Sequence, residues 1–188
     1  MIETRTRLLD IGEEAVRSRG FAGFSYADLA RDVGIRKASI HHHFPTKADL
    51  GLALTQRYAE NLAATLDAIR EGSGTAGEAL RKAIGVYRAS TEGGRSLCLC
   101  VALATDTALL SEEVRVALEA ANQATVQWFQ RALETAQSDG SVTGVTDPAE
   151  EAHAILALLQ GAQLLAKAAA STTAFDCAVA SLEARING

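Results

Sequence analysis

Proline is scarce in this sequence, and the residue pattern of β-strands is missing from it. The 188 residues include only two prolines, Pro45 and Pro148, so long stretches carry no residue that interrupts a helix. Aromatic residues make up 5% of the chain, and hydrophobic residues make up 48%. No segment alternates β-branched with polar residues as a half-buried strand does. We therefore expect an all-α protein of one domain, or of one small domain docked on a larger one.

Long uncharged apolar runs are also missing, and cysteine is rare. No run of 18 or more uncharged apolar residues occurs, and Glu3 and Arg5 place charge at the N-terminus, which argues against a membrane span and a secretory signal. Three cysteines, of which Cys98 and Cys100 are two residues apart, make a poor disulfide framework and indicate thiols in a reducing compartment. We expect a cytoplasmic protein.

The net charge of −5 does not indicate a nucleic-acid binder, but the charge is distributed unevenly. Residues 1–60 hold nine Lys and Arg against eight Asp and Glu, a balance of +1. The remaining 128 residues hold nine against fifteen, a balance of −6. The first third is therefore the less acidic part of the chain, which is a weak signal by itself.

Capping residues and glycines divide the chain into expected helices. The first helix ends at Gly20, Ser25 is an N-cap for a short helix that Gly34 ends, and Asp147 followed by Pro148 is a strong helix start. The stretch 71–77, rich in Gly, Ser and Thr, is the clearest linker. The expected helices span residues 4–19, 26–32, 36–43, 46–70, 78–92, 97–109, 112–137, 148–170 and 173–186.

The second and third expected helices meet the requirements of a helix-turn-helix motif. Such a motif needs a small residue between the helices, a glycine in the tight turn and an apolar residue that roots the second helix. Ala30, Gly34 and Ile40 stand at these positions. The segment FSYADLARDVGIRKASIHHHFPTKADL resembles the DNA-binding segment of the TetR family of regulators. The resemblance covers about residues 4–60, and its most specific part is the run from His43 to Lys47.

The resemblance implies contacts with double-stranded operator DNA at particular positions. Hydroxyl and amide groups at the start of the first short helix would bond phosphates, and the recognition helix would reach base edges in the major groove. His41 and His42 replace the aromatic residues that are usual in the family, which leaves the sequence preference open. The implied phosphate contacts are Ser25, Tyr26, His42 and Lys47; the implied groove residues are Lys37, Ala38, Ser39 and His41; Arg36 would contact a base or a phosphate.

Three consecutive histidines also suggest a metal site, but helical geometry argues against one. Side chains at i, i+1 and i+2 point about 100° apart and cannot converge on one ion. We expect no metal and no cofactor. His43 is more consistent with packing against the first helix than with a DNA contact.

The C-terminal two-thirds shows no phosphate loop, no HExxH motif and no plausible catalytic triad, so we do not expect an enzyme. The resemblance implies a helical effector-binding and dimerisation domain, residues 49–188, joined through helix 46–70 to a DNA-binding domain, residues 1–48. Its last two helices would form the interface of a homodimer. Apolar residues support this interface: Ala154, Ile155, Leu158, Leu159, Ala162 and Leu165 on one helix, and Val179, Leu182 and Ile186 on the other.

Two kinds of signal remain open for this half of the chain. With Ser96 as N-cap, Cys98 would lie in the first turn of a helix, where the helix N-terminus and Arg95 favour a thiolate. The segment CLCVALATDTALLSEEVRVAL is similar to that of TetR-like repressors that respond to electrophiles and oxidants. In these repressors a cysteine at the position of Cys98 is the sensor, and the lysine that matches Lys167 is its neighbour.

Alternatively, Cys98 is a buried packing residue, as we expect for Cys100 and Cys177. The effector would then be a small apolar or amphipathic molecule, in a pocket formed from Tyr87, Leu103, Trp128, Phe129 and Gln163. The sequence thus predicts a dimeric DNA-binding regulator, a repressor released from a palindromic operator by an inducer or by modification of Cys98. A helical protein-interaction module, or an enzyme without DNA binding, is the alternative.

Overall fold

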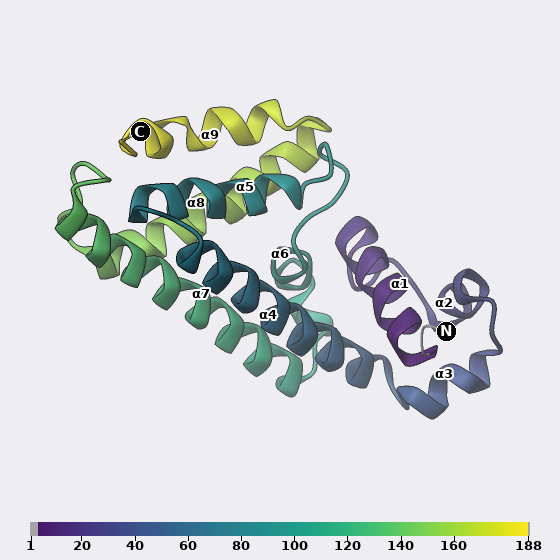
Figure 1. The fold of residues 1–188 in the computed structure, drawn as a ribbon. Coiled ribbons are helices and arrows are strands. Elements are labelled where there is room, and N and C mark those ends of the chain that lie inside the picture. The colour runs from purple at the N-terminus through teal and green to yellow at the C-terminus, as the bar shows by residue number, and fades with distance from the viewer. Residues whose placement is uncertain (1–3, 188) are drawn as a thin grey trace. The chain divides into compact units, whose positions relative to one another are not determined.

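A computed structural model describes residues 4–187 of the chain. These residues fold almost entirely into helices, and the expected all-α class is confirmed (Figure 1). The one β-type contact between them is an isolated bridge that joins Val142 and Ile186. The elements are α1 Thr4–Arg19, α2 Tyr26–Val33, α3 Lys37–His43, α4 Lys47–Glu71, α5 Ala76–Ala89, α6 Leu99–Ala104, the short 3-10 helix η1 Thr107–Leu109, α7 Glu112–Asp139, α8 Pro148–Ala169 and α9 Thr173–Glu183.

Most helix ends fall within a few residues of the expected positions because local capping determines them. Gly34 ends α2 in the left-handed conformation, with φ 78°, which glycine adopts without steric cost. The Asp147 side chain accepts hydrogen bonds from the amides of Ala149 and Glu150 at the start of α8. The largest error concerns the expected helix 97–109, which is replaced by the six-residue α6, a turn and η1.

The chain forms two compact units, which we describe separately. The first unit comprises the residues up to Glu60 together with Leu99–Ala121, and the second comprises Asn61–Cys98 with Asn122–Gly188. The expected domain boundary at residue 48 lies near the start of α4, inside the first unit. That boundary remains a prediction about function.

The core of the first unit holds the helix-turn-helix together. Leu8, Ile40, Leu50 and Leu54 are fully buried, and α1 packs against α2 and α6. Arg57 on α4 forms ion pairs with Asp10 and Glu13 of α1, at 2.6 Å and 2.9 Å.

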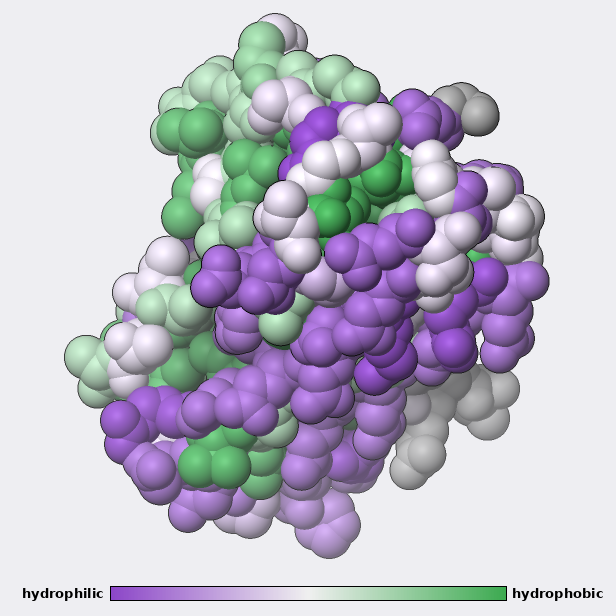
Figure 2. All heavy atoms as spheres, turned by 90° about the vertical axis from the view of Figure 1, so that its left-hand side faces the viewer, coloured by the Kyte–Doolittle hydropathy of each residue, from purple (hydrophilic) through white to green (hydrophobic). Residues whose placement is uncertain are grey.

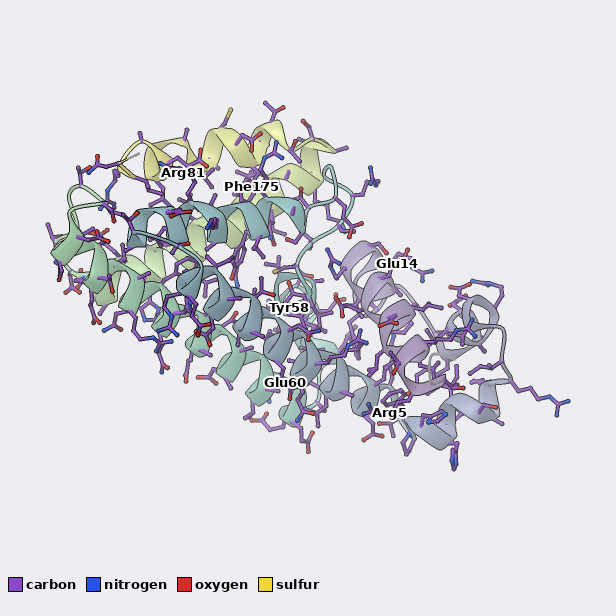
Figure 3. The ribbon with its side chains drawn as sticks, in the orientation of Figure 1. Arg5, Glu14, Tyr58, Glu60, Arg81 and Phe175 are labelled. Carbon is purple, nitrogen blue, oxygen red and sulfur yellow. The ribbon has the colours of Figure 1, made fainter. Side chains whose placement is uncertain are left out.

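The second unit is built around one apolar cluster from α5, α7, α8, α9 and the C-terminal part of α4. Phe175 of α9 is completely buried and lies between α9 and α5 (Figure 3). By length and composition alone α8 is apolar enough to cross a membrane. In the structure, however, α8 packs against α5 and α9 and buries Ile155, Leu159 and Ala162 in this cluster.

Candidate functional site

The recognition helix α3 buries one residue, half-buries His43 and exposes the rest. Ile40 is fully buried and roots the helix in the core of the first unit, while Ala30 and Gly34 occupy the helix contact and the turn as the sequence predicts. The predicted contact residues on this helix and at its start are all exposed: Arg36, Lys37, Ala38, Ser39, His41 and His42. The structure therefore brings together on one short helix a polar, solvent-facing surface of the kind that enters a DNA groove.

Ser25 forms a capping box with Asp28 at the start of α2. The Ser25 amide and hydroxyl both donate to the Asp28 carboxylate, at 2.9 Å and 2.7 Å, and the Ser25 oxygen accepts from the Asp28 amide at 3.3 Å. These hydrogen bonds from Ser25 lower the pKa of Asp28. A phosphate that bonds the donors of Ser25 would have to take the place of this carboxylate.

The Tyr26 hydroxyl does not lie at the surface, which corrects the expectation that it bonds a phosphate. Tyr26 is buried, and its hydroxyl lies 3.0 Å from the Phe44 carbonyl oxygen and 2.5 Å from that of Thr46. Burial, followed by the charge of Asp49, raises the pKa of the phenol to about 12. The hydroxyl therefore remains protonated and holds the turn between α3 and α4.

Lys47 is a second correction, because its ammonium group points into the protein. Nζ donates to the carbonyl oxygens of Phe21 and Phe24, at 2.5 Å and 2.6 Å, and lies 4.8 Å and 4.2 Å from the centres of the same two rings. Burial lowers its pKa, whereas Asp106 and Asp28 act in the opposite direction. Lys47 thus fastens the start of α4 to the turn after α1 instead of standing ready for a phosphate.

Sequence reasoning missed Asp106, which follows α6. Its carboxylate accepts a hydrogen bond from the Ala22 amide at 3.0 Å, across 84 residues of sequence. The same carboxylate oxygen would lie 3.0 Å from a Cβ at Gly20, which has φ 82°. Asp106 therefore holds the segment after α6 against the turn between α1 and α2, and no local sequence signal reveals this contact.

Cys98 is buried but does not lie in the first turn of a helix. Helix α6 begins one residue later, at Leu99, and the Ser96 hydroxyl contacts the Glu92 carboxylate at 3.2 Å, so the expected Ser96 cap is wrong. Cys98 is 3% exposed and is the last residue of the second unit before the chain enters the first. Cys98 therefore stands at the cap position of a six-residue helix and not in its first turn.

Gln163 is the polar residue that fixes this part of the second unit. It is completely buried, and its Oε1 accepts from the Cys98 amide at 3.2 Å. Its Nε2 donates to the Tyr87 carbonyl oxygen at 2.9 Å and to the Ser90 hydroxyl at 2.6 Å. Lys167 lies one helical turn further along α8, half-buried, and burial lowers its pKa. Gln163 thus joins α8 to the end of α5 and to the backbone of Cys98.

The other predicted pocket residues are only partly brought together. Tyr87, Trp128 and Phe129 are buried in the cluster of the second unit, with ring centres 6.3 Å apart for Tyr87 and Phe129 and 5.3 Å apart for Trp128 and Phe129. Leu103 belongs to the first unit. Among the described residues, the buried indole Nε1 of Trp128 is a donor without a hydrogen-bond partner.

The two remaining cysteines differ in their surroundings. Cys100 is buried, as expected for a packing residue, whereas Cys177 is exposed on α9, so the expectation that it packs inside the chain is wrong. Within residues 4–187, no group of three His, Cys, Asp or Glu side chains is placed to hold a metal ion.

An apolar surface covers part of α8 and α9. Leu164 and Leu165 are 43% and 56% exposed, and Ala154, Ala157 and Ala168 lie exposed on the same helix. Figure 2 shows hydrophobic side chains gathered in its upper left part, at the level of α9 in Figure 1. Six residues that we assigned to the dimer interface belong instead to the core of the chain itself: Ile155, Leu159, Ala162, Val179, Leu182 and Ile186.

Comparisons with known proteins match both parts of the chain. The family "Bacterial regulatory proteins, tetR family" matches residues 8–54, and "Tetracyclin repressor-like, C-terminal domain" matches residues 76–182. The transcriptional repressor NemR of Escherichia coli (strain K12) is 29% identical over 185 residues, 95% of this chain and 91% of that protein.

Two solved structures are similar over nearly their whole length. A TetR family regulator from Agrobacterium tumefaciens has a TM-score of 0.92 at 28% identity and covers 98% of both chains. The reduced form of E. coli NemR has a TM-score of 0.84 at 27% identity, with 97% of this chain and 96% of that chain covered.

Proposed function

This chain belongs to the TetR family of bacterial regulators, and from that premise we propose that it is a homodimeric repressor of a palindromic operator, released by modification of Cys98. Its family and relatives are transcriptional regulators, not enzymes. The observation that carries the proposal is the exposed surface of α3, rooted by the buried Ile40. A dimer presents two such helices to half-sites about one turn of DNA apart.

The apolar surface of α8 and α9 supports dimerisation. Exposed Leu164 and Leu165 lie among small residues, and small side chains let helices approach one another closely. A two-fold axis places the same patch on both subunits, so a self-complementary apolar face suits the interface. Burial of both leucines against a second copy would also remove their unfavourable exposure to water.

Three observations support Cys98 as the point at which the signal enters. It is the residue at which the chain passes from the second unit into the first, and α6, which follows directly, packs against α1. Downstream of α6, Asp106 bonds the turn between α1 and α2. One similar structure is described as the reduced form of a repressor, which fits a thiol that acts as a switch.

A non-covalent effector is the second candidate, and Trp128 is the observation that favours it. A buried indole N–H without an acceptor is unusual in proteins, and a ligand oxygen beside the Tyr87–Trp128–Phe129 cluster would satisfy it.

The test uses the purified full-length protein and a duplex from the DNA upstream of its own gene. N-ethylmaleimide is the probe: the Cys98 thiol adds across its double bond, a C–S bond forms, and the thiol proton ends on the neighbouring carbon. We expect operator binding that weakens steeply with salt and is lost after modification. Cys98→Ser should abolish the loss, whereas Cys100→Ser and Cys177→Ser should retain it. Release by N-ethylmaleimide that persists in Cys98→Ser would assign the switch to another thiol, Cys100 or Cys177, whereas wild-type binding that N-ethylmaleimide leaves unchanged would direct the search to ligands at Trp128.

A further inference from the structure

His41 is held in one orientation by two contacts within the first unit. Its Nδ1 lies 2.9 Å from the Pro45 carbonyl oxygen. Its ring also meets the ring of Tyr26 edge-to-face, with centres 5.0 Å apart and planes at 64°. Tyr26 is itself buried and bonded through its hydroxyl to the carbonyls on either side of Pro45. The imidazole therefore cannot turn over without giving up a hydrogen bond.

The bond to Pro45 determines where the imidazole carries its proton. A carbonyl oxygen can only accept, so Nδ1 must be the donor in this contact. In neutral imidazole the second nitrogen then carries a lone pair and no hydrogen. His41 is exposed on α3, so the group that it offers to a partner is the acceptor Nε2.

DNA presents few groups that such an acceptor can use. Phosphate oxygens are acceptors themselves and cannot bond a neutral Nε2. In the major groove guanine offers N7 and O6, which are acceptors, and thymine offers O4 and a methyl group. Only the exocyclic amino groups, N6 of adenine and N4 of cytosine, donate there.

We infer that His41 is a specificity-determining residue that accepts a hydrogen bond from the exocyclic amino group of an adenine or cytosine in each half-site. This inference rests on the proposed function, because it requires operator DNA. His42 is the natural comparison: it is exposed on the same helix, and its ring meets that of His43 edge-to-face, with centres 5.4 Å apart.

The experiment removes the amino group from the DNA and, separately, the Nε2 acceptor of His41 from the protein. Random duplexes are first selected with the full-length protein, at a pH of about 8, where histidine is ordinarily neutral. In the selected operator, each adenine or cytosine is then replaced in both half-sites by an analogue that lacks the amino group. Adenine is also replaced by its 7-deaza analogue, which lacks the N7 acceptor. Affinities are measured for the wild type, His41→Asn and His42→Asn. Asparagine can keep a donor near Pro45 but lacks the distal nitrogen.

At one position, deletion of the amino group should weaken wild-type binding by about fivefold per half-site, the value of one neutral hydrogen bond. His41→Asn should lose this sensitivity, and His42→Asn should retain it while binding all duplexes more weakly. Replacement of adenine by its 7-deaza analogue should change the affinity of the wild type and of His41→Asn by the same factor. Equal sensitivity of the wild type and His41→Asn at every position would overturn the inference, as would coupling of His41 to N7. Failure to select any sequence would overturn the proposed function and the inference with it.

Discussion

Replacement of Gln163 by Met tests whether this residue is the main polar tie within the second unit. Methionine has nearly the same length and volume but cannot replace the three hydrogen bonds. Because Gln163 is completely buried, water cannot take its place at the Cys98 amide, whereas the half-buried Ser90 hydroxyl still donates to the Tyr87 carbonyl at 2.8 Å. A net loss of about 1 kcal/mol per bond, larger where a buried partner is left unpaired, gives a destabilisation of about 2–4 kcal/mol.

The assay is thermal unfolding of the reduced protein at fixed concentration, since dimerisation makes Tm concentration-dependent. For a chain of this size the predicted loss lowers Tm by roughly 5–12 °C. The matched control is Gln160→Met, one turn earlier on α8, where a partly exposed amide bonds the Asn122 side chain at 3.2 Å. That variant should change stability by less than about 1 kcal/mol. Equal effects of the two substitutions would refute the reasoning.

Three further predictions follow from other contacts. Lys47→Met should lower the free energy of unfolding, measured in urea, by about 1–3 kcal/mol because two carbonyls lose their donor. It should leave the salt dependence of operator binding unchanged. A decrease of about one in the slope of log affinity against log salt concentration would show that Lys47 contacts a phosphate instead. The pKa of Tyr26 is raised from 10.0 to about 12, so its contribution to the free energy of unfolding is complete below pH 10 and is lost as the pH rises through about 12. In Tyr26→Phe, the free energy of unfolding should not show this decline at alkaline pH. A decline of equal size in both proteins would argue against a stabilising role of the Tyr26 hydroxyl. Leu165→Glu should give a monomer in sedimentation experiments because it places a charge in the proposed dimer interface on the surface of α8 and α9. An unchanged dimer would exclude this surface as the dimer interface.

The sequence predicted the helices well because most of their ends are local events. Ser25, Gly34 and Asp147 act on residues no more than four positions away, so their residue types suffice to locate the helix ends. The residues that position the recognition helix, Ala30, Gly34 and Ile40, could also be predicted from their spacing, because they lie close together in the sequence. The exposed face of α3 was predictable because a seven-residue helix with one large apolar residue, Ile40, has only one side to bury.

The errors concern contacts between residues far apart in the sequence. The carbonyls that engage Tyr26 and Lys47 belong to every residue type, so no side-chain pattern reveals them. Asp106 reaches Ala22 across 84 residues. The resemblance assigned Lys47 to DNA, but its position beside two aromatic rings is determined by the fold of the turn after α1.

The energy needed for release suggests that both subunits must be modified. A thousandfold loss of operator affinity corresponds to about 4 kcal/mol. Extra volume forced into a packed interior costs about 1–3 kcal/mol, and Cys98, 3% exposed, lies in such an interior. This cost weakens operator binding when it is relieved in the conformation that leaves the DNA. One adduct in each subunit therefore supplies about the required amount, and one adduct per dimer supplies half of it. Mixed dimers with one Cys98→Ser subunit, treated with N-ethylmaleimide, should lose operator affinity by about thirtyfold. Full release of the mixed dimer would instead require a concerted switch of both subunits, which a single adduct can trigger.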